Sequence, residues 1–230
     1  MSDDFEARRS AARDRLSHEA QDGRTIDERH AFFEAVYEGA HHDPAAVPWA
    51  ELQPKPALAD WLSRLPEGER QGRAVDVACG LGDNAVALAD AGFETVGFDF
   101  AEHAISWARE RFPGAGVHFR LADLFDPPAE WVGAFDLVHE CYTIQSFQDD
   151  LREAAFAAVV DLVAPGGRLL VIARTRPEDA APVGPPVPLT PSELARFEEL
   201  GLRRVWSEDY VITRPDKSIP HTIAEYRKEK

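Results

Sequence analysis

From residue 73 onward, short apolar runs alternate with segments in which apolar residues recur at helical spacing. The runs have the length of buried strands and lie at residues 74–78, 94–98, 117–120, 135–139 and 168–173. The segments with helical spacing lie at residues 83–91, 101–112 and 151–162. Strands that alternate with helices pair in parallel, so the pattern predicts an α/β fold with helices on both faces of a mostly parallel sheet.

The pattern changes after residue 174. Residues 176–188 contain five prolines, too many for regular structure, and we expect a surface loop there. Thr190-Pro191-Ser192-Glu193 predicts a helix start, because it combines a capping residue, a proline at the first helical position and a glutamate three residues on. Two strand-like runs follow at residues 202–212 and 221–226, with the spacing of an antiparallel pair.

The segment before the alternating region is predicted to be helical with one long loop. Residues 3–22 are charged and rich in alanine, which is typical of a solvated helix or a frayed arm. Residues 26–40 carry apolar side chains at helical spacing, and Thr25 with Glu28 can cap the start of that helix. Residues 41–54 contain prolines and small residues, so we expect a loop before a further short helix.

Composition and charge narrow the class of protein. The net charge of −16 disfavours a nucleic-acid partner or an anionic membrane surface, since both are bound largely through Lys and Arg. No apolar run exceeds strand length, so no membrane-spanning helix is expected. The acidic start of the chain and its two cysteines favour a reducing, cytoplasmic location without a secretion signal. A small-molecule ligand is the partner class that remains.

A glycine-containing loop follows the first predicted strand. The loop lies at a strand-to-helix junction, where α/β sheets bind ligands. Its sequence context is Val75-Asp76-Val77-Ala78-Cys79-Gly80-Leu81-Gly82-Asp83-Asn84. Glycine lets the backbone approach a ligand closely, although Gly80-x-Gly82 alone fits a plain tight turn equally well. Asp99 ends the next strand, where its carboxylate can accept both ribose hydroxyls or cap the following helix.

A second acid follows the third predicted strand. The Asp123 carboxylate can accept the exocyclic amine of adenine while Leu124 packs on the ring. Taken alone, Asp123 fits an ordinary turn. Together with the glycine loop and Asp99 it places ligand-type residues at the ends of three successive strands, which predicts a nucleoside-binding edge.

These residues resemble those of a known family. Asp76-x-Ala78-x-Gly80-x-Gly82 resembles motif I of the class I S-adenosylmethionine-dependent methyltransferases, usually acid-x-Gly-x-Gly-x-Gly, with Ala78 in place of the first glycine. Asp99 is similar to that family's ribose acid and Asp123 to its adenine residue. Phe135-Asp136-Leu137-Val138 resembles motif IV, and Leu162-x-x-Pro165-Gly166-Gly167-x-Leu169 resembles the turn before strand five. The resemblance covers residues 70–230.

The resemblance implies a fold, a cofactor and a reaction. It implies a Rossmann-like seven-stranded, mostly parallel sheet with an antiparallel C-terminal strand pair, formed by residues 56–230. It implies in-line transfer of the methyl group of S-adenosyl-L-methionine to sulfur, oxygen or nitrogen of a small molecule. It implies no metal. The residues that it places at the cofactor are Asp76, Ala78, Gly80, Gly82, Asn84, Asp99, Phe100, Asp123, Leu124 and His139.

The N-terminal segment carries a further likeness. Phe33-Glu34-x-x-Tyr37-Glu38-Gly39, followed by Pro48-Trp49, resembles the entry segment of the thiopurine and tellurite-resistance methyltransferase group. That likeness implies that residues 1–55 are a helical arm covering the site, with Tyr37 or Trp49 reaching the cofactor. Packing of the arm on the sheet explains Trp49 equally well.

The acceptor side is predicted at the end of the fourth strand. There His139 or Glu140 can deprotonate an acceptor and Tyr142 can orient it, or all three can serve only to fix the cofactor. The Asn/Asp-Pro-Pro-Tyr motif of DNA and protein-amide methyltransferases is not found at this position. His41 and His42 lie in a loop that can fold over the site, although solvated loop histidines are the commoner case.

Two alternatives remain at this point. Gly80-x-Gly82-x-x-Ala85 with Asp99 satisfies the dinucleotide fingerprint, so an NAD-dependent oxidoreductase is the competing enzyme. Asp76, Asp123 and the lack of a separate substrate domain weigh against it. A non-catalytic protein that binds S-adenosylmethionine is the other alternative. Oligomeric state cannot be derived from the pattern.

Overall fold

The computed structural model of the chain describes residues 3–17, 25–184, 186–214 and 217–230. Its centre is a seven-stranded sheet in the order β3-β2-β1-β4-β5-β7-β6. The first five strands in that order pair in parallel, and β7 is antiparallel to both of its neighbours. The strands are β1 Arg73–Val77, β2 Glu94–Asp99, β3 Val117–Leu121, β4 Phe135–Cys141, β5 Val163–Arg174, β6 Leu202–Thr213 and β7 Ser218–Lys228. The predicted sheet with its antiparallel C-terminal pair is thereby confirmed.

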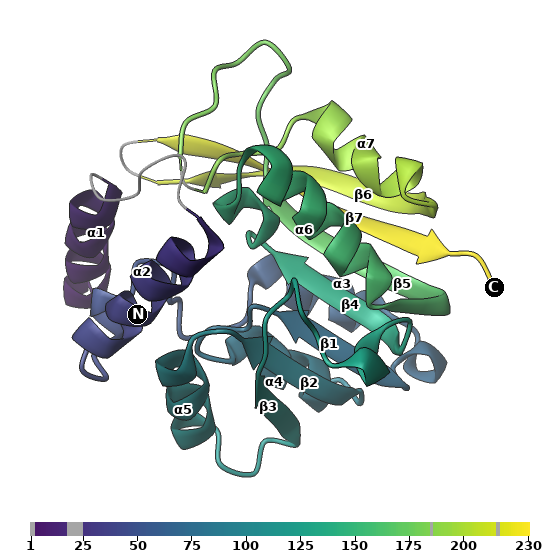
Figure 1. Ribbon diagram of the computed structural model, residues 1–230, viewed down its shortest axis with the longest axis horizontal. Coiled ribbons are helices and arrows are strands. Elements are labelled where there is room, and N and C mark those ends of the chain that lie inside the picture. Colours follow the sequence, from purple (N-terminus) through teal and green to yellow (C-terminus); the bar gives the residue numbers. More distant parts are fainter. Residues whose placement is uncertain (1–2, 18–24, 185, 215–216) are drawn as a thin grey trace.

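Helices cover both faces of this sheet. In Figure 1, α6 and α7 lie on the face toward the viewer, α3 and α4 lie behind, and α1 and α2 lie beside the ends at which the parallel strands stop. The helices are α1 Asp3–Ser17, α2 Ile26–Gly39, α3 Pro56–Arg64, α4 Asp83–Asp90, α5 Glu102–Arg111, α6 Asp149–Asp161 and α7 Pro191–Glu199. In the part of the chain described, no helix combines the length and apolar character that crossing a membrane requires.

The strand register divides the apolar side chains between the two layers. Successive residues of a strand point to opposite faces, so Val75 and Val138 share the core under α6, while Ala74 and Leu137 share the one under α3. Because both faces are covered, the central strands are mostly apolar. Buried ionisable side chains in β1, β2 and β4 are therefore exceptions that need a reason, and they lie toward the carboxyl ends, at Asp76, Asp99, His139 and Glu140.

The local signals place most helix starts correctly. Thr25 with Glu28 and Thr190 with Glu193 both form complete capping boxes. One expectation was wrong: residues 165–167 are not a turn ahead of the fifth strand but lie inside β5. The strand already pairs at Val163 with Phe135, and the extra residues form an irregularity in the register before Arg168. Part of the predicted N-terminal helix, residues 18–22, lies outside the described residues.

Candidate functional site

The loop between β1 and α4 has the backbone that its glycines predict. Ala78, Gly80 and Gly82 have φ angles of 51°, 51° and 89°, all in the left-handed region. A side chain there costs on the order of 1–2 kcal/mol, which explains why the motif prefers glycine where this chain has Ala78. The Cys79 N–H donates to the Phe98 carbonyl at 2.8 Å, so the loop is attached to the neighbouring strand β2.

Asp99 joins this loop to the start of α5. Its Oδ2 accepts the Gly80 N–H at 3.1 Å, and its Oδ1 accepts the Ala101 N–H at 3.0 Å. The side chain is buried, and burial raises the pKa of Asp99 to about 6. Ala101, not Asp99, is the capping residue of α5. The carboxylate thus holds the geometry of the loop, and its contact with a ribose remains a prediction.

The third predicted acid lies beside an unforeseen histidine. Asp123 Oδ1 accepts the Phe125 N–H at 2.9 Å, and its Oδ2 lies 3.5 Å from His30 Nε2. The His30 ring stacks on Phe100 with centroids 4.1 Å apart. Leu124 packs in the main core, so the flat aromatic surface next to Asp123 is supplied by the half-buried His30 and Phe100. His30, Phe33 and Tyr37 share one face of α2, and this spacing was the signal available in the sequence.

The N-terminal arm lies over the glycine loop. A Cβ atom on Gly80 would be 2.9 Å from the Tyr37 hydroxyl oxygen. That hydroxyl accepts a hydrogen bond from Trp49 Nε1 at 2.7 Å, and Phe33 meets the Trp49 ring edge-on. The Tyr37 hydroxyl therefore lies next to Gly80, where the backbone can approach a ligand. Contact between Tyr37 and the cofactor is a prediction.

The other loop side chains of the arm point elsewhere. His41 and His42 are exposed, and His42 packs on Trp107 and pairs with Glu110 of α5. The structure does not bring either histidine to the site, in agreement with the solvated alternative.

Asp76 and His139 form a buried pair. They are register partners on β1 and β4, and Asp76 Oδ1 lies 2.7 Å from His139 Nδ1. Their other polar atoms, Asp76 Oδ2 and His139 Nε2, have no hydrogen-bond partner among the described residues. The contact through Nδ1 leaves Nε2 of His139 and Oδ2 of Asp76 as the two atoms able to bind a ligand. Buried orphan atoms of this kind call for a ligand that completes them.

Glu140 points to the opposite face of β4. Its Oε1 accepts the Ile144 N–H at 3.0 Å, its Oε2 has no partner among the described residues, and burial raises the pKa of Glu140 to about 7. Since adjacent strand residues face opposite sides, Glu140 and His139 cannot act on one acceptor atom from the same direction. Glu140 supports the turn that follows the strand.

Tyr142 directly follows β4 at the carboxyl ends of the parallel strands, and its φ is 66°. Lys55 Nζ lies 4.6 Å from the centroid of the Tyr142 ring, and Arg174 Cζ lies 5.5 Å from it. The Lys55 N–H donates to Asn84 Oδ1 at 2.9 Å, so the predicted cofactor residue Asn84 uses its carbonyl oxygen to hold this loop.

The arrangement suits S-adenosylmethionine. The cofactor carries a sulfonium, an ammonium and a ribose diol, which match carboxylate oxygens and a backbone cradle. Orphan oxygens of Asp76 and Glu140, the Asp99 carboxylate and the left-handed loop lie along one edge. Within the described ranges, no group of three or more His, Cys, Asp or Glu side chains is arranged to hold a metal ion.

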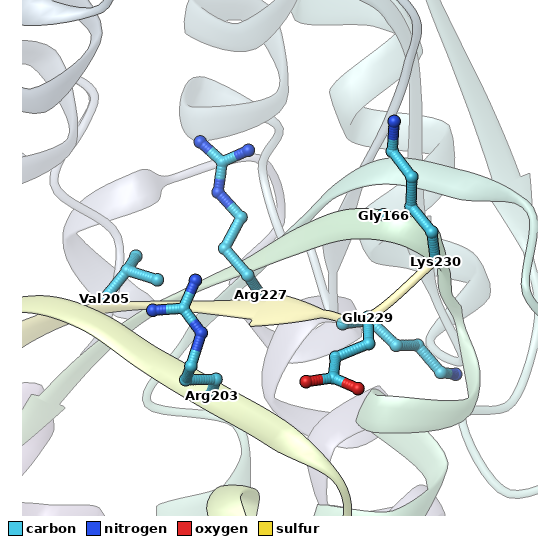
Figure 2. A pocket seen from close by; sticks show the side chains of 7 residues that line it. Gly166, Arg203, Val205, Arg227, Glu229 and Lys230 are labelled. Atoms are coloured by element: carbon cyan, nitrogen blue, oxygen red, sulfur yellow. The ribbon is translucent and has the colours of Figure 1, made fainter.

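A surface hollow lies at the opposite edge of the sheet. Figure 2 shows Gly166, Arg203, Val205, Arg227, Glu229 and Lys230 around it. Gly166 and Arg203 are near the starts of β5 and β6, so the hollow is at the amino ends of the parallel strands. It contains none of the predicted site residues.

The chain is similar to known methyltransferases. A family model described as a methyltransferase domain matches residues 74–167. The 2-heptyl-1-hydroxyquinolin-4(1H)-one methyltransferase of Mycobacteroides abscessus is 27% identical over 182 residues, which is 77% of each chain.

Solved structures share the fold. Burkholderia thailandensis 1,6-didemethyltoxoflavin-N1-methyltransferase, with bound 1,6-didemethyltoxoflavin and S-adenosylhomocysteine, gives a TM-score of 0.69 at 17% identity and covers 90% of this chain and 92% of its own. TehB from Haemophilus influenzae gives a TM-score of 0.61 at 15% identity and covers 80% of this chain and 65% of its own.

Proposed function

Because this chain belongs to the class I S-adenosylmethionine-dependent methyltransferases and methylates a small molecule, we propose that its reaction takes place at the carboxyl edge of β1, β2 and β4. The observation that carries this location is the hydrogen bond from Gly80 to Asp99, which ties a left-handed backbone loop to a buried carboxylate. Because the chain belongs to this family, the alternative of an NAD-dependent oxidoreductase is set aside.

Each part of the cofactor has a group to hold it in this proposal. Asp99 accepts the ribose hydroxyls, and Asp123 with the stacked His30 and Phe100 holds the adenine. Asp76 and His139 hold the methionine portion, since their unpartnered buried atoms are able to bind a ligand. When bound, the cofactor supplies a methyl group activated by its sulfonium. The protein supplies alignment and exclusion of water.

On the acceptor side, Tyr142 orients the substrate and Glu140 positions the turn that carries Tyr142. The N-terminal arm of residues 1–55 closes over the cofactor, with Tyr37 and Trp49 at its contact with the glycine loop. This arm and the fold shared with TehB support a place near the thiopurine and tellurite-resistance group. The name of the Mycobacteroides relative supports a hydroxyl on a heteroaromatic ring as the acceptor.

The setting proposed for the enzyme is the cytoplasm. Both cysteines, Cys79 and Cys141, are free thiols, which suits a reducing compartment. The net charge of −16 supports a small molecule as the partner, not nucleic acid or an anionic membrane.

Calorimetry and turnover together test the proposal. Purified protein is titrated with S-adenosylhomocysteine, S-adenosylmethionine and NADH, and then assayed for S-adenosylhomocysteine release with hydroxyl, thiol and amine acceptors. We expect both sulfur ligands to bind and NADH not to bind. Binding of neither sulfur ligand by the folded protein would refute the cofactor site. Binding without turnover of any acceptor class would support the non-catalytic alternative.

A further inference from the structure

Beyond the cofactor residues, the carboxyl edge carries a cluster of cations and aromatic rings. The Lys55 ammonium and the Arg174 guanidinium both lie over the Tyr142 ring, at 4.6 Å and 5.5 Å from its centroid. Tyr142 follows β4, Arg174 ends β5, and Lys55 precedes α3. Three separate elements therefore bring these side chains together next to the strand that holds His139.

Arg174 is a cation without an ion-pair partner among the described residues. Lys55 forms an ion pair with Glu51 at 2.9 Å, but among the described residues no Asp or Glu lies within ion-pair distance of Arg174. Its Nε is buried without a hydrogen-bond partner. Withdrawing a guanidinium from water without a counter-charge is costly, and such groups are normally paired.

A neighbouring arginine adds to this cost, and Glu51 offsets part of it. Burial and the positive charge of Arg214 lower the pKa of Arg174, against the opposing influence of Tyr142 and Glu51. Burial, together with Arg214, Arg9 and Arg174, lowers the pKa of Arg13 on α1 to about 10. The chain as a whole has a net charge of −16, so a local excess of cations runs against its composition. A ligand with a negative charge would remove the penalty at Arg174.

Two further aromatic rings, His221 and Tyr210, pack behind Tyr142. The His221 ring of β7 stacks on Tyr210 of β6 with centroids 5.2 Å apart, and it lies 5.8 Å from the Tyr142 ring. Burial, Arg174 and Lys55 lower the pKa of His221 to about 4, against the opposing influence of Glu51 and the bond to the Ile219 carbonyl. The ring is neutral at physiological pH and is buried, so the His221–Tyr210 stack forms an uncharged aromatic support behind Tyr142.

Resting on the proposed function, we propose that Arg174, Lys55 and Tyr142 bind an aromatic acceptor as its anion. The acceptor is an acidic aryl or heteroaryl hydroxyl or thiol that has already lost its proton to solvent. A lone pair of the anionic oxygen or sulfur forms the new bond to the methyl carbon. The carbon–sulfur bond of the sulfonium breaks, and its electron pair stays on sulfur. One anion and one cation thus give two uncharged products.

Such an acceptor requires no general base at the edge. Burial raises the pKa values of Tyr142 and Cys141, so both remain protonated and neither can remove a proton. The protonated Tyr142 hydroxyl is instead a hydrogen-bond donor, which an anionic acceptor prefers.

Binding of a matched anion and neutral amide tests this inference. Protein saturated with S-adenosylhomocysteine is titrated with 2-naphthoate and with 2-naphthamide, which differ in charge but hardly in shape. We expect the carboxylate to bind at least about tenfold more tightly, the scale of hydrogen bonds to charged groups. Arg174→Gln should remove that preference, and Arg174→Lys should retain part of it. Arg203→Gln, which deletes the same charge at the opposite edge of the sheet, should leave it unchanged.

The outcomes separate the two proposals. Failure of the wild-type protein to bind S-adenosylhomocysteine counts against the proposed function. Normal binding of S-adenosylhomocysteine with no preference for the naphthoate, or a preference that survives Arg174→Gln, overturns the anion site alone. Circular dichroism and S-adenosylhomocysteine affinity report whether the variant is folded. Should Arg174→Gln not fold, Lys55→Met removes the second cation over the Tyr142 ring and must reduce the preference about tenfold.

Discussion

The affinity for S-adenosylhomocysteine is expected to depend on pH through Asp99. Burial raises the pKa of this carboxyl from 3.8 to about 6. Between these two pH values Asp99 is protonated in the folded protein and ionised in the unfolded chain. The shift from 3.8 corresponds to about 3 kcal/mol of destabilisation by the ionised group above pH 6. Stability contributed by the protonated form is present at low pH and is lost as the pH rises through the folded value.

Binding of the cofactor reverses this preference. Ribose hydroxyls donate to the ionised carboxylate, so the ligand favours the form that the free protein disfavours. The dissociation constant should be constant well above pH 6 and should increase by up to about tenfold for each pH unit below it. Asp99→Ala should weaken binding at pH 7 by about 1.5–3 kcal/mol, in addition to leaving the N–H groups of Gly80 and Ala101 without their acceptor.

Isothermal titration calorimetry across this pH range measures the effect, and Asp99→Asn is the matched control. The amide retains one acceptor oxygen for the backbone but does not titrate, so its profile should be flat through pH 6. Glu140, whose pKa burial raises to about 7, is present in both proteins, so any contribution from it cancels in the ratio of the two dissociation constants. An inflection near pH 6 that persists in Asp99→Asn would show that another group is responsible. Unchanged affinity in a folded Asp99→Ala protein would remove Asp99 from the cofactor site.

Four further outcomes are expected. Gly80→Val should abolish S-adenosylhomocysteine binding in a folded protein, because its φ is 51° and a Cβ would lie 2.9 Å from the Tyr37 hydroxyl; normal calorimetric binding would mean that the glycine serves only the turn. Ala78→Gly should stabilise by up to about 1 kcal/mol in urea unfolding, since relief of left-handed strain exceeds the entropy cost of glycine, and destabilisation would contradict this. Thr190→Ala should cost about 1 kcal/mol of stability through the lost cap, with unchanged cofactor affinity. Hydrogen exchange in residues 26–54 should slow when S-adenosylhomocysteine binds, and equal protection in both states would make this segment ordinary scaffold.

Local features of the sequence determined the elements and the glycine loop. Strand and helix periods differ, and capping boxes act over three residues, so Thr25 and Thr190 could be interpreted without knowing what surrounds them. The acid and the small residues at 76–82 likewise specify a turn whose geometry depends mainly on its own backbone. The bulge inside β5 was missed because Val163 extends the strand by pairing with Phe135, a contact between distant segments.

Only the tertiary structure decided which side chains meet. Asp76 and His139 are 63 residues apart, and they pair because the sheet order places β1 beside β4 in one register. His30 reaches Asp123 because α2 crosses the ends of the strands. Arg174 has no ion-pair partner within the described part of the chain for the same kind of reason, because its neighbours Lys55 and Tyr142 come from other elements. Local sequence pattern fixes the hydrogen bonds within a helix or turn, but a charge is paired or unpaired according to what the whole sheet brings to it.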